Sequence, residues 1–131
     1  MSGLVEVLSG RRPIGAYRWE SNASVDDVRD TVEHAGWRFA HLEGRRIETA
    51  AEFHVAIAEA LGLPDYYGRN LDALADCLGD VAGSQLLLWD VWSVLADREP
   101  RLFATAVELL GSALALVLRG DGADLGLHLL D

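Results

Sequence analysis

Hydrophobic residues recur along the chain with the two periods that distinguish strands from helices. Residues 86–89 and 113–118 are continuously apolar, which predicts two strands covered on both faces of a sheet. Residues 37–42 alternate between apolar and polar positions, which predicts a strand with one buried face. Residues 125–130 are a weaker candidate for a last strand. The pattern therefore predicts a small sheet with a largely buried centre.

Helical segments lie between these strands and have recognisable end signals. Ser24 is the expected N-cap of a helix that ends at Gly36. Thr49, with Glu52 three residues later, has the pattern of a capping box. The other expected boundaries are the end of that second helix at Gly62, a third helix from Asn70 to about residue 81, a helical turn over residues 92–95 and a last helix from Pro100 to Gly111.

The first 21 residues are the least regular part of the sequence, and residues 4–8 and 16–19 could form short strands there. Strands and helices alternate through the rest of the chain. This order predicts an α/β fold in which a small, mostly parallel sheet is packed by helices. A chain of 131 residues has the usual length of one domain and can bury a sizeable core. We therefore expect residues 1–131 to form a single domain.

The charge balance narrows the classes of partner. The chain has 21 acidic and 11 basic residues, which gives a formal net charge of −10. Such a chain should repel nucleic-acid phosphates and suits a basic protein partner, although acidity also serves simply to keep a protein soluble. We therefore expect no direct binding of nucleic acid.

Two features of the sequence bear on its location in the cell. No apolar run approaches the roughly 20 residues that span a bilayer, and the first residues lack the basic start of a secretory signal. A single cysteine, Cys77, fits a reducing compartment. We therefore expect a cytoplasmic protein without a membrane partner.

Metal and cofactor chemistry is not indicated by the sequence. The four histidines lie far apart, and none is spaced as a ligand pair with Cys77. Cys77 lies beside the apolar face of its helix and is expected to be a core residue. We expect no metal and no cofactor.

The helix expected from Asn70 to about residue 81 has one acidic face. At 100° per residue, Asp72, Asp76 and Asp80 gather on one side, and Ala75 and Gly79 keep that side low. From residue 64 to residue 90 there are five aspartates and one arginine, a local charge of −4. This face is either an ordinary solvated helix surface or an anionic surface shaped to enter a basic cleft.

The stretch from residue 63 to residue 78 reads L-P-D-Y-Y-G-R-N-L-D-A-L-A-D-C-L. It resembles the pattern L-P-x-Y-Y-G-x-N-L-D-A-L-x-D-C-L of the barstar family. Gly44, Ile47 and the pair Phe53 and His54 are similar to family positions upstream. The resemblance covers residues 37–119, the expected barstar-like core, and residues 1–36 are expected to be an N-terminal extension packed on or extending that core.

The resemblance implies an intracellular inhibitor, and not an enzyme, that blocks the active site of a small secreted guanyl-specific ribonuclease. Asp76 matches the aspartate that takes the place of the substrate phosphate, and Asp72 matches a second interface acid. Tyr66 matches an interface aromatic residue; the adjoining Tyr67 is expected to be packed inside. The expected ribonuclease-binding residues are Tyr66, Gly68, Asn70, Asp72, Ala75, Asp76, Gly79 and Asp80.

The sequence departs from the family pattern at a few interface positions. Ala75 stands where the family has a tryptophan, Gly79 and Asp80 stand where it has threonine and glycine, and Glu108 lies near a family glutamate. These changes put the identity of the target ribonuclease in question.

Two other functions stay open from the sequence. One is an immunity protein against a different toxin. The other is an enzyme that uses Asp72 and Asp76 as paired carboxylates, although neighbouring turns of one helix would give both acids the same exposed environment.

Overall fold

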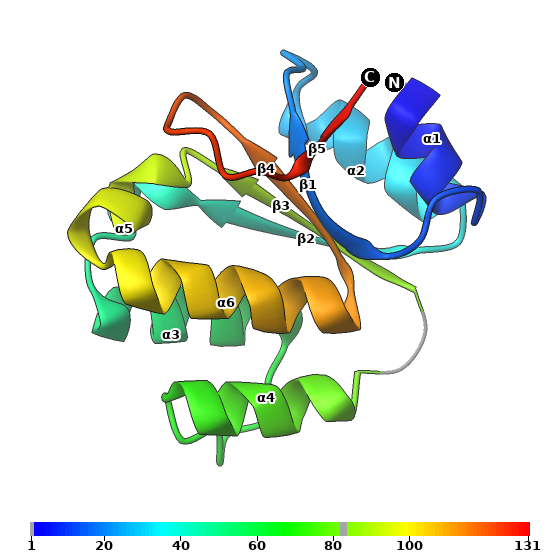
Figure 1. The fold of residues 1–131 in the computed structure, drawn as a ribbon. Coiled ribbons are helices and arrows are strands. Elements are labelled where there is room, and N and C mark those ends of the chain that lie inside the picture. The colour runs from blue at the N-terminus through cyan, green and yellow to red at the C-terminus, as the bar shows by residue number, and fades with distance from the viewer. Residues whose placement is uncertain (1, 82–83) are drawn as a thin grey trace.

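The computed structural model describes residues 2–81 and 84–131. In this part of the chain, five parallel strands form one sheet with the order β2-β3-β4-β1-β5 (Figure 1). The prediction of an α/β fold with a parallel sheet is confirmed. The strands are β1 (Gly15–Trp19), β2 (Arg38–Glu43), β3 (Gln85–Asp90), β4 (Ala115–Arg119) and β5 (His128–Leu130).

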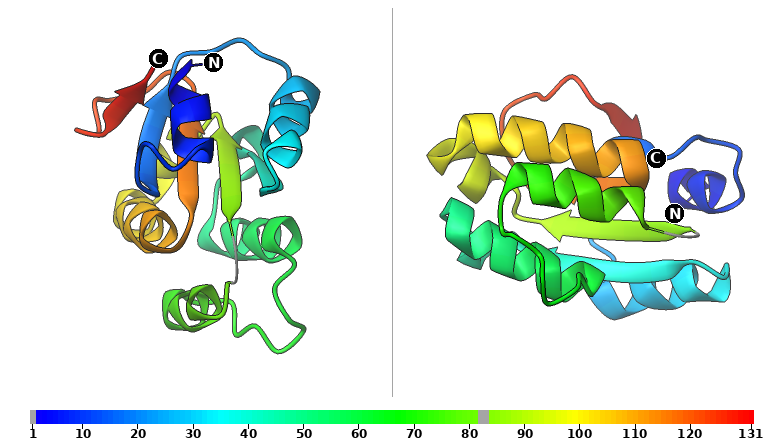
Figure 2. Two further views of the ribbon diagram at one scale, coloured as in Figure 1. Left: turned by 90° about the vertical axis from the view of Figure 1, so that its right-hand side faces the viewer. Right: turned by 90° about the horizontal axis from the view of Figure 1, so that it is seen from below.

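Helices cover both faces of the sheet (Figures 1 and 2). On one face lie α1 (Ser2–Leu8) and α2 (Val25–His34). On the other lie α3 (Ala50–Leu61), α5 (Ser93–Arg98) and α6 (Pro100–Ala113), and a short 3-10 helix, η1 (Gly44–Arg46), follows β2. One helix, α4 (Leu71–Gly79), does not lie on the sheet but packs outside α6, as the lowest element in Figure 1.

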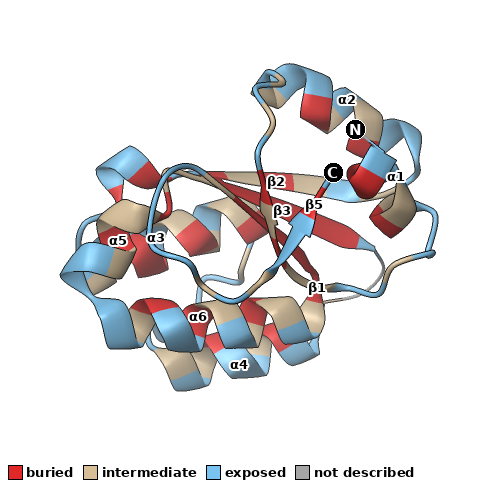
Figure 3. Cartoon of the chain, turned by 45° about the horizontal axis from the view of Figure 1, so that its top comes forward, coloured by how far each residue is buried: buried red, intermediate tan, exposed pale blue. Residues whose placement is uncertain are grey.

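Strands β3 and β4, which pair with each other inside the sheet, divide their side chains between two cores. Figure 3 shows buried residues, in red, along the strands and on the helices beside them. Leu87, Trp89, Leu116 and Leu118 face the core beneath α3, α5 and α6. Their neighbours in the chain, such as Leu86 and Val117, face the core beneath α1 and α2. Because alternate residues of a strand point to opposite faces, both faces of β3 and β4 are apolar, as the continuous apolar runs predicted.

The predicted helix starts are found at the predicted residues. The Ser24 side chain accepts from the Asp27 amide, and Thr49 and Glu52 form the complete capping box. The predicted end at Gly62 is also confirmed, since this residue has the left-handed backbone conformation with φ of 63°. Helix α4 ends at Gly79, earlier than expected, and residues 82–83 lie outside the described residues.

Two elements differ from the prediction, each for a packing reason. Residues 4–8 belong to helix α1 and not to a strand. Leu4 and Val7 lie on one face of this helix and are buried against the sheet. Helix α6 continues past Gly111, where a Cβ atom would lie 3.1 Å from the backbone nitrogen of Ala16. Gly111 therefore permits the close approach of α6 to β1 and does not end the helix.

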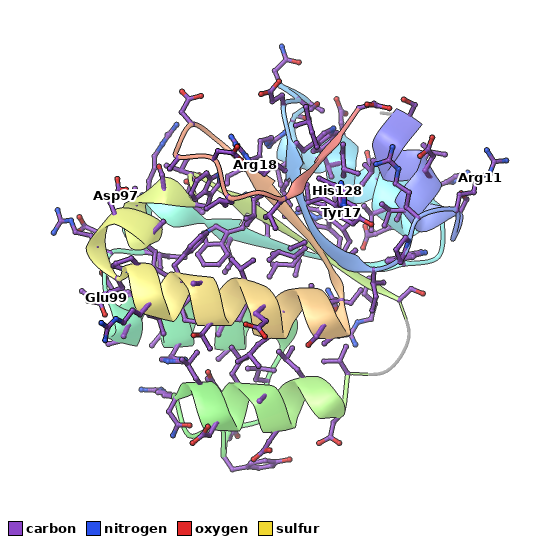
Figure 4. All side chains as sticks on the ribbon, viewed as in Figure 1. Arg11, Tyr17, Arg18, Asp97, Glu99 and His128 are labelled. Atoms are coloured by element: carbon purple, nitrogen blue, oxygen red, sulfur yellow. The ribbon has the colours of Figure 1, made fainter. Side chains whose placement is uncertain are left out.

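The N-terminal residues contribute a strand to the interior of the sheet. β1 pairs with β4 on one side and with β5 on the other, so Tyr17 lies opposite Val117 and also opposite His128. Figure 4 shows Tyr17 and His128 side by side at this pairing. In the described residues, no helix is both long and apolar enough to cross a membrane.

Candidate protein-binding surface

Helix α4 is held rigidly although it lies outside the two sheet-covering layers. The Oδ1 atom of Asn70 accepts from the amide of Ala73 at 2.8 Å, which caps the helix as predicted. Leu74 and Leu78 are buried in the core that α3 and α6 share with the sheet. One side of α4 is therefore fixed by packing, and the opposite side faces away from the molecule (Figure 4).

The outward side of α4 consists of acidic and small residues. Asp72, Ala75, Asp76, Gly79 and Asp80 are all exposed. Within the described chain, no basic side chain forms an ion pair with any of these three aspartates. The surface therefore presents three carboxylates without local partners to any molecule that approaches it.

The loop before α4 presents one tyrosine outward and buries the other. The Tyr66 side chain is 82% exposed, whereas Tyr67 is only 8% exposed, in agreement with the prediction for this pair. The Tyr67 hydroxyl lies 2.6 Å from Nδ1 of His54 in α3, and both side chains are buried. Burial lowers the pKa of His54 and raises the pKa of Tyr67 to about 12, with a smaller contribution from Cys77 to the latter.

Gly68, Arg69 and Asn70 shape the link between this loop and the helix. A Cβ atom on Gly68 would lie 3.3 Å from Cβ of Ala73, so the loop runs close over the first turn of α4. The Asn70 side chain also donates to the carbonyl of Gly68 at 3.3 Å. Arg69 has a φ of 55°, a left-handed conformation that the sequence did not signal.

A shallow hollow of about 270 Å³ lies between α4 and α6 beside the aspartates. From α4 the lining includes two expected interface residues and one core residue. From α6 it includes residues that the sequence analysis did not single out. The lining residues are Ala75, Leu78, Gly79, Leu109, Ser112 and Ala113. Glu108 is exposed on α6 but is not among the residues that line this hollow.

All eight residues expected to bind the ribonuclease are exposed and lie on α4, its caps or the loop before it. We refer to Tyr66, Gly68, Asn70, Asp72, Ala75, Asp76, Gly79 and Asp80 as the acidic face. Cys77, on the inner side of the same helix, is a half-buried free thiol. In the described residues, no group of three or more His, Cys, Asp or Glu side chains is placed to hold a metal ion.

Comparison with known sequences gives a matching family and a relative that is similar over a short segment. The model of the family described as Barstar (barnase inhibitor) matches residues 37–125. A protein of Bacillus subtilis (strain 168) named "Putative ribonuclease inhibitor YrdF" is 51% identical over 37 residues. That match spans 28% of this chain and 41% of the length of the relative.

Two solved structures with a similar fold contain longer chains, of which this chain covers about a third. A chain in the structure of Drosophila ORC bound to DNA is 17% identical with a TM-score of 0.60, covering 82% of this chain and 32% of that chain. The Aeropyrum pernix ORC1 protein, in complex with DNA, is 19% identical with a TM-score of 0.64. The match covers 95% of this chain and 37% of that chain. At such low identity these likenesses concern the arrangement of strands and helices alone.

Proposed function

Because the chain belongs to the barstar family of barnase inhibitors, we propose that it is an intracellular inhibitor of a small secreted guanyl-specific ribonuclease. The acidic face binds the ribonuclease and closes its active site. The main support for this proposal is the set of three exposed aspartates on α4 and its C-cap. In the described chain these aspartates have no ion-pair partners, although the helix itself is firmly packed.

The electrostatics of such a complex favour both fast and tight association. A ribonuclease active site concentrates cationic side chains to bind a phosphate, and those cations repel one another when no anion is present. The carboxylate of Asp76 takes the place of the phosphate and relieves that repulsion, while Asp72 meets a base at the rim. The net charge of −10 attracts a basic partner over a distance, which raises the association rate.

The packing of α4 contributes to affinity by reducing the entropy lost on binding. The buried leucines and the Asn70 cap already hold the backbone of the helix in one conformation. Little backbone ordering is then needed when the partner binds, so more of the interaction energy is available for affinity.

We propose that the chain is a cytoplasmic protein that works as one domain, residues 1–131, and has no catalytic activity of its own. The exposed positions of Asp72 and Asp76, on one face and in the same solvent, give no basis for separating their roles into acid and base. A protein with this negative charge is also a poor ligand for nucleic acid, because phosphates are repelled.

The test is a titration of a purified guanyl-specific ribonuclease with the chain, using cleavage of a fluorescent RNA as the measurement. We expect activity to fall to zero at one molar equivalent, and the chain alone to leave the RNA intact. A variant with Asp72, Asp76 and Asp80 all replaced by Asn serves as the control for charge. Inhibition of a toxin of another kind, with no effect on any guanyl-specific ribonuclease, would instead support an immunity protein against that toxin.

A further inference from the structure

The loop of residues 64–70 is attached to the body of the protein through one side chain. Within this loop only Tyr67 is buried, and every other residue from Pro64 to Asn70 is exposed. The backbone of the loop forms one turn, in which the Tyr67 amide donates to the carbonyl of Pro64 at 2.9 Å. The position of Tyr66 and the entry into α4 therefore depend on how firmly Tyr67 is held.

Tyr67 is held by a buried hydrogen bond and by a row of packed rings. Its hydroxyl lies 2.6 Å from Nδ1 of His54, and the two ring centroids are 5.9 Å apart. His54 packs edge-on against Phe53 at 5.2 Å, and Phe53 stacks on Trp89 of β3 at 5.5 Å. This row connects the exposed loop to the centre of the sheet.

Both partners of this hydrogen bond are neutral because both are buried. Burial disfavours the protonated form of His54 and the ionised form of Tyr67, so both side chains are neutral near pH 7. The bond therefore joins two neutral groups, the Tyr67 hydroxyl and Nδ1 of His54, and the tautomer of His54 sets which of them donates. Breaking this bond would leave a buried polar atom without a partner, which makes the anchor sensitive to a single substitution.

The backbone of the loop also favours release once the anchor is lost. Arg69 has a φ of 55°, a conformation that residues other than glycine adopt at a cost. With Tyr67 free, relaxation of this residue is opposed only by exposed contacts, such as the 3.3 Å hydrogen bond from the Asn70 side chain to the carbonyl of Gly68. The loop would then sample other conformations, and the affinity for a partner would fall with the fraction of molecules that keep the binding conformation.

We infer that His54 is a positioning residue for the acidic face, because its hydrogen bond to Tyr67 fixes the loop that presents Tyr66 and leads into α4. This inference rests on the proposed function for its effect on inhibition. Its effect on the loop itself can be measured in the free protein, and the two effects are tested separately.

The first arm measures amide hydrogen exchange of residues 65–73 in the free protein. Tyr67→Phe removes the hydroxyl and His54→Leu removes the imidazole nitrogen, and each should raise exchange in this segment by roughly tenfold. His54→Asn, whose side-chain amide can accept or donate near the position of Nδ1, should keep most of the protection. Val32→Ala, a buried change on the opposite face of the sheet, should lower the melting temperature but leave exchange in this loop unchanged.

The second arm measures the inhibition constant of the same variants against the ribonuclease. Tyr67→Phe and His54→Leu should each weaken inhibition by roughly tenfold, and the double variant should be no weaker than the poorer single variant, since both remove one bond. Val32→Ala should inhibit as the unmodified chain does.

The outcomes separate the two claims. Loop exchange that is unchanged in Tyr67→Phe and His54→Leu, or raised equally by Val32→Ala, overturns the positioning role. Looser loops with unchanged inhibition also overturn it. If the unmodified chain inhibits no ribonuclease, the proposed function fails, and the exchange measurements still decide whether His54 fixes the loop.

Discussion

Arg119 donates from Nε to Oδ1 of Asp90 over 2.6 Å, so a part-buried ion pair joins the carboxyl ends of β4 and β3. Oδ2 of Asp90 also lies 2.8 Å from Nε2 of His41 in β2. The guanidinium of Arg119 in turn donates to the carbonyls of Ser21 and Ala23, at 3.3 and 2.7 Å, in the link between β1 and α2. One network of hydrogen bonds thus connects three strands with the loop that follows a fourth.

This network predicts a specific loss of stability in acid. Burial raises the pKa of Asp90, but the hydrogen bonds from His41 and Arg119 and the charge of Arg119 outweigh it and lower the pKa from 3.8 to about 2. A carboxyl group whose pKa is lowered by folding stabilises the protein above its ordinary pKa. That stabilisation, about 2 kcal/mol, is lost as the pH falls from about 5 to about 2.

The measurement is urea unfolding of the protein and of Asp90→Asn across this range of pH. The variant should be less stable near pH 7 and should lose less stability on acidification than the unmodified chain. Parallel curves for the two proteins would show that Asp90 does not titrate as the network requires.

Asp76 should be the most sensitive position of the acidic face. It is exposed near the middle of α4, beside Ala75 and one turn before Asp80, so it can reach deepest into a cleft. Asp76→Ala should weaken inhibition by about 2–5 kcal/mol, mainly through faster dissociation, because it leaves cationic groups of the partner unpaired. Asp80→Ala, at the end of the helix, should have a much smaller effect.

The two alanine variants should melt at temperatures close to that of the unmodified chain, because both side chains are exposed and lie outside the core. Inhibition constants and circular dichroism melts check this together. A folded Asp76→Ala protein that inhibits as well as the unmodified chain contradicts the phosphate-mimic mechanism.

Salt should slow the formation of the complex. Attraction between a chain of net charge −10 and a basic ribonuclease acts through solvent and is screened within about 10 Å at 0.1 M salt. Stopped-flow association rates should therefore fall steeply as salt is added, whereas dissociation rates should change little. Equal association rates at low and high salt would argue against electrostatic steering.

Gly44 should tolerate no larger residue. A Cβ atom there would overlap the carbonyl oxygens of Asp90 and Val91, which are backbone atoms and cannot move aside easily. Gly44→Ala should reduce the free energy of unfolding by about 1–3 kcal/mol. Gly79→Ala is the matched control for stability, since its Cβ atom would meet no neighbour within 4 Å, and chemical denaturation of both variants makes the comparison.

Removal of residues 1–23 should prevent cooperative folding. The deletion takes away β1, which pairs with β4 and β5, and with it the buried side chains of Tyr17 and Trp19. We expect the shortened chain to show no sharp thermal transition by circular dichroism. A shortened chain that melts cooperatively would show that residues 24–131 fold without β1.

The local signals in the sequence were sufficient for much of the fold. Helix caps such as Ser24, Thr49 and Asn70 act on atoms within three residues, so their effect can be inferred without knowing the tertiary structure. The continuous apolar runs of β3 and β4 likewise reflect burial on both faces. The positions of the acidic residues on α4 follow directly from helical geometry.

The features that the sequence did not reveal depend on contacts between distant residues. A glycine such as Gly111 often marks the end of a helix. It lies inside α6 because Ala16, nearly a hundred residues earlier in the chain, packs against it and requires a small neighbour. The left-handed backbone of Arg69 and Val91 has no marker in either residue type. The contribution of Leu109 and Ser112 to the hollow beside α4 likewise requires the packing of α6 against α4.

The position of β1 in the sheet sets the order in which the chain can assemble. Its two neighbours are residues 115–119 and 128–130, whereas β2 and β3 can pair once residue 90 has been synthesised (Figure 2). Contacts between residues so distant in sequence form slowly, because a large loop must close first. During synthesis, β1 with its Tyr17 and Trp19 side chains therefore stays unpaired until β4 emerges from the ribosome. An apolar strand exposed for that time is a hazard for aggregation, and chaperone binding to the nascent N-terminal segment would reduce it.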